Sequence, residues 1–151
     1  MKTKILFFLL AILPFISGCN NTEDVKALLV GKTWRLSDFY YKNGSIIPYQ
    51  NANEIFKNNP DGFYLKFNDN NTFNGKAINC SFSGTWNGSG KTNDFSMKIT
   101  NTAGSDASQI IAVDFINAVK AAYSYKADEN ILTIYYSYGV RDESMSFYVK
   151  K

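Results

Sequence analysis

The chain has 151 residues, 45% hydrophobic and 16% aromatic, which suits a single globular domain with one core. Its formal net charge is only +3 and no block of like charges occurs, so there is no electrostatic basis for nucleic-acid binding. It contains no histidine, which excludes Ser-His-Asp and Cys-His catalytic arrangements and removes the commonest metal ligand.

The N-terminus, "MKTKILFFLLAILPFISGCN", has the layout of an export signal. Two lysines precede an apolar run at residues 5–16, and small residues follow it. The run is too short to cross a bilayer as a helix, and Pro14 interrupts it. We therefore predict a signal peptide at residues 1–18 rather than a retained membrane helix.

The stretch "ISGC" at residues 16–19 resembles the lipobox of bacterial lipoproteins. In that family the cysteine thiol is joined to diacylglycerol and the signal is cut directly before the cysteine. The resemblance implies lipid attachment at Cys19, signal cleavage between Gly18 and Cys19, and a membrane as partner through the anchor. Several acyl chains would hold the domain at a membrane effectively permanently.

A polar segment, "NNTEDVK", follows the cysteine. We predict a lipidated tether at residues 19–26 and a single domain at residues 27–151. Asn20 is not the aspartate that holds well-studied enteric lipoproteins at the inner membrane. Glu23 and Asp24 resemble the acidic tract that sends some Bacteroidetes lipoproteins to the cell surface. The expected location is the bacterial envelope, at the outer membrane, on its periplasmic face or at the cell surface.

Alternation of apolar and polar residues predicts β-strands along most of the domain. Asn43-Gly44 and the stretch "NDNN" supply turn residues between them. Clear alternation occurs at residues 34–41, 63–67, 95–100, 131–137 and 145–149.

Two segments do not follow this alternation of apolar and polar residues. Residues 46–62 carry two prolines and several asparagines and predict a long surface loop with one helical turn. Ile111, Phe115, Ala118 and Ala122 recur at helical spacing, which predicts an amphipathic helix at about residues 107–121. The expected fold is mainly β, a small antiparallel, partly open barrel or curled sheet with one α-helix between late strands.

Residues typical of a catalytic or metal site are not grouped in the sequence. The adjacent acids Asp128/Glu129 and Asp142/Glu143 lie in polar stretches and are expected to form solvated turns. The tyrosine runs at 40–41 and 135–138 are expected to pack at the sheet surface, and the alternative is a partner or carbohydrate surface. We predict no catalytic residue, no cofactor and no metal, and we do not expect an enzyme.

Cys80 lies in "AINCSFSGTW", where it shares its parity with Ile78, Phe82 and Trp86. That parity points its side chain toward the apolar face. No histidine is available to activate a thiolate. We therefore predict a buried, unreactive cysteine that behaves as a small hydrophobe.

The order of features resembles the META/HslJ-like domains of bacterial envelope lipoproteins. Leu29, Gly31 and Trp34 resemble the start of that family's pattern, and "YLKFNDNNTF" resembles its strand and turn. The chain lacks the second cysteine that the family often has before its helix. The residues that resemble its central signature are Gly75, Cys80, Phe82, Gly84 and Trp86.

The resemblance implies a small antiparallel barrel or sandwich with one helix and a non-enzymatic role in the envelope. The expected function is an interaction, structural or stress-related module that meets another envelope protein. The alternative is a lipocalin-like lipoprotein that binds a small apolar ligand inside its barrel, because "LVGKTW" and "SGTW" also suit that family.

Overall fold

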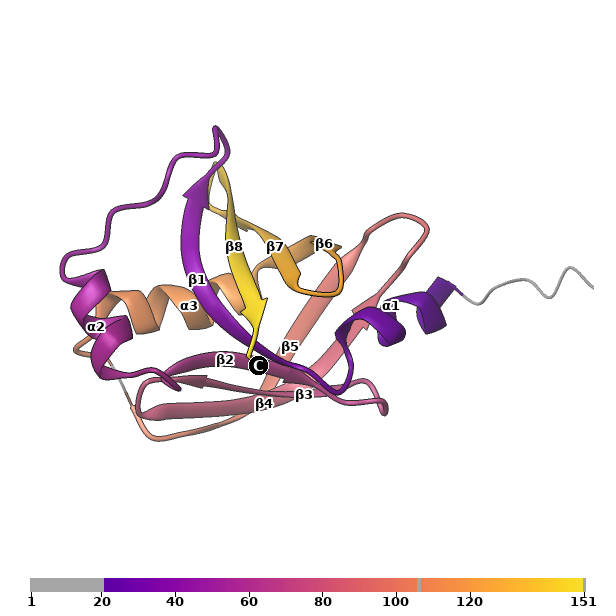
Figure 1. Cartoon of the computed structure of the whole chain (residues 1–151), viewed down its shortest axis with the longest axis horizontal. Helices are drawn as coiled ribbons and strands as arrows, with labels where there is room; N and C mark the ends of the chain where they lie inside the picture. Colours follow the sequence, from indigo (N-terminus) through magenta and orange to yellow (C-terminus); the bar gives the residue numbers. More distant parts are fainter. Residues whose placement is uncertain (1–20, 106, 151) are drawn as a thin grey trace, which may run out of the picture.

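The computed structural model describes residues 21–105 and 107–150. The predicted signal peptide and the cleavage and lipidation residues, Gly18 and Cys19, lie outside this part of the chain. Within it, eight strands form one antiparallel sheet in the order β5-β4-β3-β2-β1-β8-β7-β6. The predicted fold class, a curled antiparallel sheet with a helix between late strands, is confirmed (Figure 1).

The elements follow one another along the chain with short connections, apart from the segment between β1 and β2. In chain order they are α1 (Asn21–Leu29), β1 (Thr33–Tyr41), α2 (Ala52–Asn58), β2 (Phe63–Phe67), β3 (Thr72–Ala77), β4 (Cys80–Gly88), β5 (Phe95–Ala103), α3 (Ile110–Lys120), β6 (Ala122–Ala127), β7 (Ile131–Tyr138) and β8 (Arg141–Val149).

The sheet curls into a half-barrel because its two edge strands, β5 and β6, approach each other at one end only. There the backbone bridges Asp94 and Ser124, and the amide of Tyr125 donates to the carbonyl of Asn93 at 3.1 Å. Elsewhere α3 packs against β3, β5 and β7. The helix therefore covers the opening that the sheet leaves.

Aromatic rings fill the inside of the curled sheet. Phe115 of α3 is fully buried, and its ring lies 5.7 to 6.1 Å, centroid to centroid, from the rings of Phe63, Phe82 and Phe147. Rings in this distance range pack favourably beyond the area they bury. Other large side chains with less than 2% exposure are Trp34, Phe67, Phe73, Leu65, Leu132, Ile134 and Met145.

A β-bulge in β1 places the aromatic ring of Phe39 in the core. The register of β1 with β8 shifts between Leu36 and Asp38. Strict alternation from Trp34 and Leu36 would turn Phe39 outward, but the bulge restores it to the inner face, where it is 2% exposed.

The N-terminal helix α1 belongs to the core. Val25 and Leu29 are fully buried, and the Trp34 indole Nε1 donates to the carbonyl of Leu29 at 3.0 Å. The described part of the segment expected to form a tether is thus helical from Asn21 onward. The chain enters the domain at the end of the half-barrel that α1 covers (Figure 1).

Two details differ from the sequence-based prediction. Ile78, expected in one strand with Cys80, instead occupies the turn between β3 and β4 with a φ of 54°. Ala122, expected on the helix, begins strand β6. Cys80 itself is 6% exposed, so its predicted burial is confirmed.

The central place of Phe115 yields a stability prediction. Phe115→Ala should lower the free energy of unfolding by about 3–5 kcal/mol, because it leaves a cavity among the surrounding rings. Urea denaturation measures the change. The control, Val113→Ala on the exposed side of the same helix, should change it by no more than about 0.5 kcal/mol. Equal effects of the two substitutions would contradict the assigned packing of α3.

Candidate functional site

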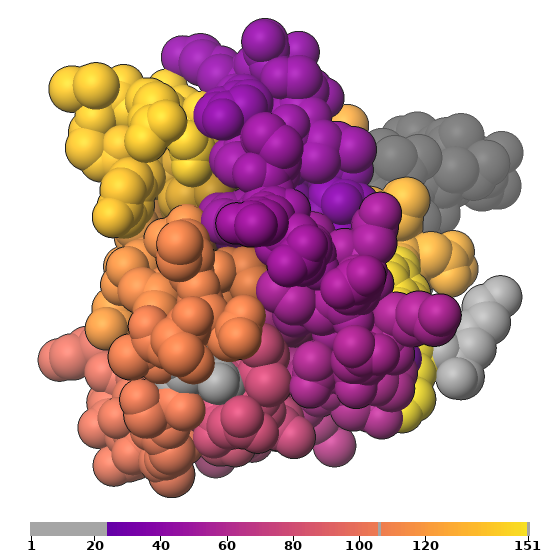
Figure 2. Space-filling model, turned by 90° about the vertical axis from the view of Figure 1, so that its left-hand side faces the viewer, coloured from indigo at the N-terminus to yellow at the C-terminus, as the bar shows by residue number. Residues whose placement is uncertain are grey.

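A groove of about 750 Å³ lies between the β1–β2 connection and the start of α3. Figure 2 looks onto this end of the molecule, where the purple segment containing α2 meets the orange segment at the start of α3. Neutral amides contribute much of the lining, which we call the amide groove. They are Gln50, Asn51, Asn58, Asn59, Asn79 and Gln109.

The turn between β3 and β4 forms one side of the amide groove. Ile78 lines the groove and adopts the left-handed conformation, which is unfavourable for a β-branched residue. Burial of its side chain and a 2.6 Å hydrogen bond from its amide to the carbonyl of Gly62 hold it there. Strained backbone of this kind persists where the surrounding structure enforces it, and it concentrates at functional sites.

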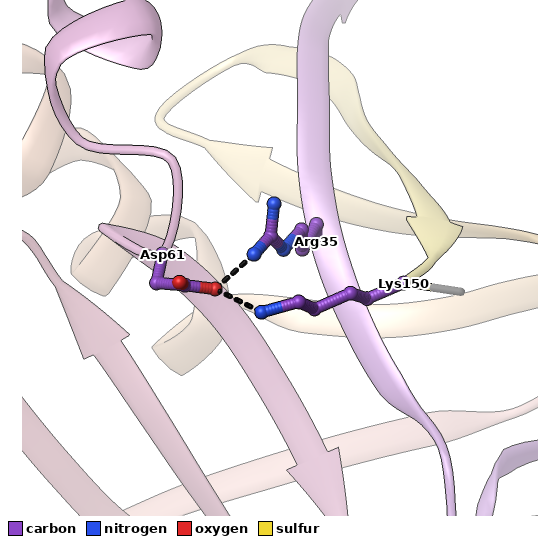
Figure 3. Close-up of polar contacts among 3 residues, drawn as sticks. All are labelled: Arg35, Asp61 and Lys150. Atoms are coloured by element: carbon purple, nitrogen blue, oxygen red, sulfur yellow. Dashed lines mark hydrogen bonds and ion pairs between the residues drawn. The ribbon is translucent and has the colours of Figure 1, made fainter.

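An ion-pair triad holds the chain that leaves α2. Asp61, in the loop before β2, accepts from Arg35 of β1 and from Lys150 after β8, the latter at 2.8 Å (Figure 3). The hydrogen bond from Lys150, followed by the charge of Arg35, lowers the pKa of the Asp61 carboxyl. The triad therefore ties the loop to two neighbouring strands and fixes one end of the segment that lines the groove.

Next to the amide groove lies a small cavity of about 110 Å³ that is lined by tyrosines, two carboxyl groups and an arginine. Tyr49 lines both cavities. We call the smaller one the tyrosine–carboxylate pocket. Its walls are Tyr41, Ile47, Tyr49, Asp114, Tyr136, Tyr138, Arg141 and Glu143.

Strand register brings three of these residues together. Glu143 of β8 lies directly opposite Tyr41 of β1 on one side and Tyr136 of β7 on the other. The Tyr136 hydroxyl donates to Glu143 Oε2 at 3.0 Å. Cross-strand neighbours of this kind are close enough for side chains to contact each other.

The fourth member of this cluster comes from α3. Asp114 Oδ2 accepts a hydrogen bond from the Tyr49 hydroxyl at 3.0 Å, and the Tyr49 ring lies 5.1 Å from that of Phe39. Tyr49 thus attaches the β1–β2 connection both to the helix and to the core. The pocket is assembled from β1, β7, β8, α3 and this connection.

Both hydrogen-bonded tyrosines stay protonated over a wide pH range. Burial, followed by the charge and hydrogen bond of Asp114, raises the pKa of Tyr49. Burial, followed by the charge and hydrogen bond of Glu143, raises the pKa of Tyr136. Each phenol therefore remains a hydrogen-bond donor to its carboxylate at neutral pH.

Glu143 was missed as a site residue by the sequence analysis. Its neighbour Asp142 pairs with Lys42 at 2.9 Å and is partly solvated, but Glu143 is 8% exposed and does not lie in a solvated turn. The sequence did contain one indication of its burial. Glu143 lies two and four residues before Met145 and Phe147, which are both predicted on the inner face, so the alternation of a strand places Glu143 on the same face. No comparable sequence pattern indicated that Tyr49 and Asp114 belong to a site.

Residues 21–105 and 107–150 present neither a metal-binding cluster nor a membrane-spanning helix. Over these ranges the structure brings together no group of three or more histidine, cysteine, aspartate and glutamate residues that could hold a metal ion. None of the helices described there has the length and apolar character needed to span a membrane.

The fold and cavities define an antiparallel β half-barrel with a helix in its opening and a polar groove at one end. A sequence model described as a domain of unknown function, DUF4847, matches residues 20–149. The chain therefore belongs to the DUF4847 family. A search of curated proteins finds no match.

Two solved structures share the fold. A DUF4847 family protein from Bacteroides vulgatus, determined by crystallography, has 24% sequence identity and a TM-score of 0.62, with 82% of this chain and 96% of that chain covered. A protein from Burkholderia xenovorans, determined by NMR, has 13% identity and a TM-score of 0.52, with 90% and 93% covered. At these identities the likeness shows the fold alone.

The resemblance to META/HslJ-like domains was wrong, because the matching family is DUF4847. The structure shows why the quoted residues misled. Gly75 faces Phe82 across β3 and β4, and a Cβ there would overlap the Phe82 ring. A Cβ at Gly84 would overlap the backbone carbonyl of Lys98 at a β-bulge. Such glycines meet packing needs that an aromatic-filled, curled sheet imposes in any family.

The tyrosine pKa shifts predict a loss of stability at alkaline pH. Below about pH 10 tyrosine is protonated in both states, and the contribution of Tyr49 and Tyr136 is fully present. As pH rises further, the unfolded chain releases these protons first, so the free energy of unfolding falls. Urea denaturation between pH 8 and pH 11 measures the slope.

Matched variants separate the contribution of these two tyrosines to the pH dependence of stability from that of the other titrating groups. Tyr136→Phe and Tyr49→Phe should each make the alkaline decline shallower, while lowering stability at pH 8 by about 1 kcal/mol through the lost hydrogen bond. Tyr123→Phe, at an exposed tyrosine, should leave the slope unchanged. An unchanged slope in both buried variants would exclude the pKa shifts as its cause.

Proposed function

We propose that the protein is a lipid-anchored, non-enzymatic binding module of the bacterial envelope that presents the amide groove to another envelope component. The observation that carries the proposal is the placement of α1. This helix begins two residues after Cys19 and packs into one end of the half-barrel, whereas α2 and the groove lie at the other end (Figure 1). An anchor at Cys19 would thus leave the groove directed away from the membrane.

The anchor itself is supported by the sequence. Residues 16–19 resemble a lipobox, and the preceding apolar run has the length of a signal peptide. Asn20, in place of the aspartate of enteric inner-membrane lipoproteins, favours the outer membrane, on the periplasmic face or at the cell surface.

The lining of the groove supports binding of a partner by hydrogen bonds. Amide side chains carry both donors and acceptors and no charge. Apolar contacts come from Ile55 and Ile111. Glu54 also lines the groove. Such a surface suits a polar partner rich in amide or hydroxyl groups, for which a few convergent polar groups set the orientation.

A non-enzymatic role is supported by the chemistry that the chain offers. The sequence contains no histidine, and Cys80 is buried in the sheet. Glu143 and Asp114 accept hydrogen bonds from tyrosines with raised pKa values, which are poor proton-transfer partners at neutral pH.

The alternative role, a lipocalin-like protein with an apolar ligand in its interior, loses its main support. Phe115, Phe82 and Phe67 occupy the inside of the half-barrel together with the other buried rings. An interior packed with aromatic side chains disfavours such a ligand.

Lipidation can be tested directly. The wild-type chain, expressed in a bacterial host, should incorporate a radioactive fatty acid and fractionate with membranes. Cys19→Ser should lose the label and the membrane association, because it removes the thiol that would carry the lipid. Cys80→Ser is the matched control and should keep both. Equal labelling of the wild type and Cys19→Ser would disprove the anchor.

The role of the groove can be tested by complementation. A deletion strain should become more sensitive to detergent, and the wild-type gene should restore growth. Asn58→Trp should fail to restore it, because an indole at this exposed position in α2 would fill the groove. Lys57→Trp, the adjacent exposed position outside the groove lining, should restore it. Equal complementation by both variants would show that the protein does not need an open groove for this function.

A further inference from the structure

The lining of the tyrosine–carboxylate pocket has a formal charge of minus one. Asp114 and Glu143 each contribute a carboxyl group, and Arg141 is the only basic residue among the described residues of its lining. The Arg141 side chain is 61% exposed, and its Nε lies 3.7 Å from Glu143 Oε1, beyond hydrogen-bond distance. A monovalent cation in the cavity would balance the remaining charge.

Glu143 Oε1 makes an ion pair with Arg141 but accepts no hydrogen bond from the described part of the chain. Its Oε2 accepts from Tyr136, but none of the hydrogen bonds in residues 21–105 and 107–150 reaches its Oε1. Its side chain is nevertheless 9% exposed and borders the cavity. A ligand N–H at Oε1 would add a charge-assisted hydrogen bond beside the ion pair that Arg141 makes with this oxygen.

The remaining walls suit an organic cation. The rings of Tyr41, Tyr49, Tyr136 and Tyr138 border the cavity, and aromatic faces attract ammonium groups that have lost their water. The hydroxyls of Tyr49 and Tyr136 donate to carboxylates and keep lone pairs that can accept. A primary ammonium group presents three N–H donors for these acceptors.

We infer that the tyrosine–carboxylate pocket binds the primary ammonium group of an amine-bearing ligand. The inference rests on the proposed role as a binding module and adds the chemical class of its ligand. Tyr49 lines both cavities, so a ligand in the amide groove that reaches past this side chain would place its amine in the pocket. The volume of about 110 Å³ admits the amine and its first carbons, and the rest of the ligand lies in the groove.

Calorimetric titration of the full-length chain in detergent tests the inference with two probes of similar shape. 1-Aminopentane should bind, and 1-pentanol should bind at least tenfold more weakly, because it lacks the positive charge and two of the three donors. Equal affinity of the two probes, or no heat from the amine at millimolar concentration, would overturn the inference.

Variants locate the binding in the pocket. Glu143→Gln keeps the shape and the acceptor for Tyr136 but removes the charge, and it should weaken amine binding at least tenfold. Asp142→Asn is the matched control, since it removes the same charge from the adjacent residue on the other face of β8, and it should leave the affinity unchanged. Asp114→Asn provides a second pocket variant and should also weaken binding. Unchanged affinity in Glu143→Gln and Asp114→Asn would assign the amine to another place.

Failure of this inference and failure of the proposed function give different results. Cys19→Ser should bind 1-aminopentane like the wild type, because Cys19 precedes α1 and this helix contributes no residue to the pocket. If the labelling or the complementation experiment contradicted the proposed function, amine binding would therefore still be expected. Conversely, absent amine binding beside normal labelling and a normal effect of Asn58→Trp would disprove only the ammonium site.

Discussion

The structure depends on one packing requirement, which is to bury the aromatic inner face of a sheet that does not close. Strands β5 and β6 meet only around the Asp94–Ser124 bridge, so rings facing the remaining opening would contact water. Helix α3 covers the opening and places Phe115 against rings from three different strands. Burial of a phenylalanine among such rings contributes several times the free energy of a surface contact, which fixes the position of the helix.

The polar site follows from the same helix. Asp114 directly precedes Phe115, and its side chain reaches Tyr49, whose ring contacts Phe39 of the core. Ile111, one turn earlier, contributes to the amide groove and is itself 2% exposed. Because the helix is held by the core, the groove and the tyrosine–carboxylate pocket rest on a rigid element although much of their lining comes from a connection. This arrangement supports a binding surface that needs little rearrangement.

Membership of the DUF4847 family and the likeness to solved structures describe the scaffold, whereas function has to be argued from the cavities. The residues that suggested another family, Gly75 and Gly84 among them, serve the close approach of strands and rings. These glycines occur at positions where a small sheet has to leave space for large aromatic side chains or for a neighbouring strand. The polar residues that line the groove and the pocket lie mainly elsewhere, in the β1–β2 connection, the start of α3 and the β7–β8 hairpin.

The sequence by itself determined the elements whose period is regular, namely β1, β2, β5, β7, β8 and α3, the burial of Cys80 and the absence of histidine chemistry. It did not reveal β6, because Ala122 continues the helical spacing, or the β3–β4 turn, because isoleucine is unfavourable at a positive φ. Only the tertiary structure decided that Tyr41 of β1 lies opposite Glu143 and that Asp114 meets Tyr49. Local patterns report the face on which a residue lies, but contacts between segments 65 or more residues apart are set by how the sheet curls and where α3 packs.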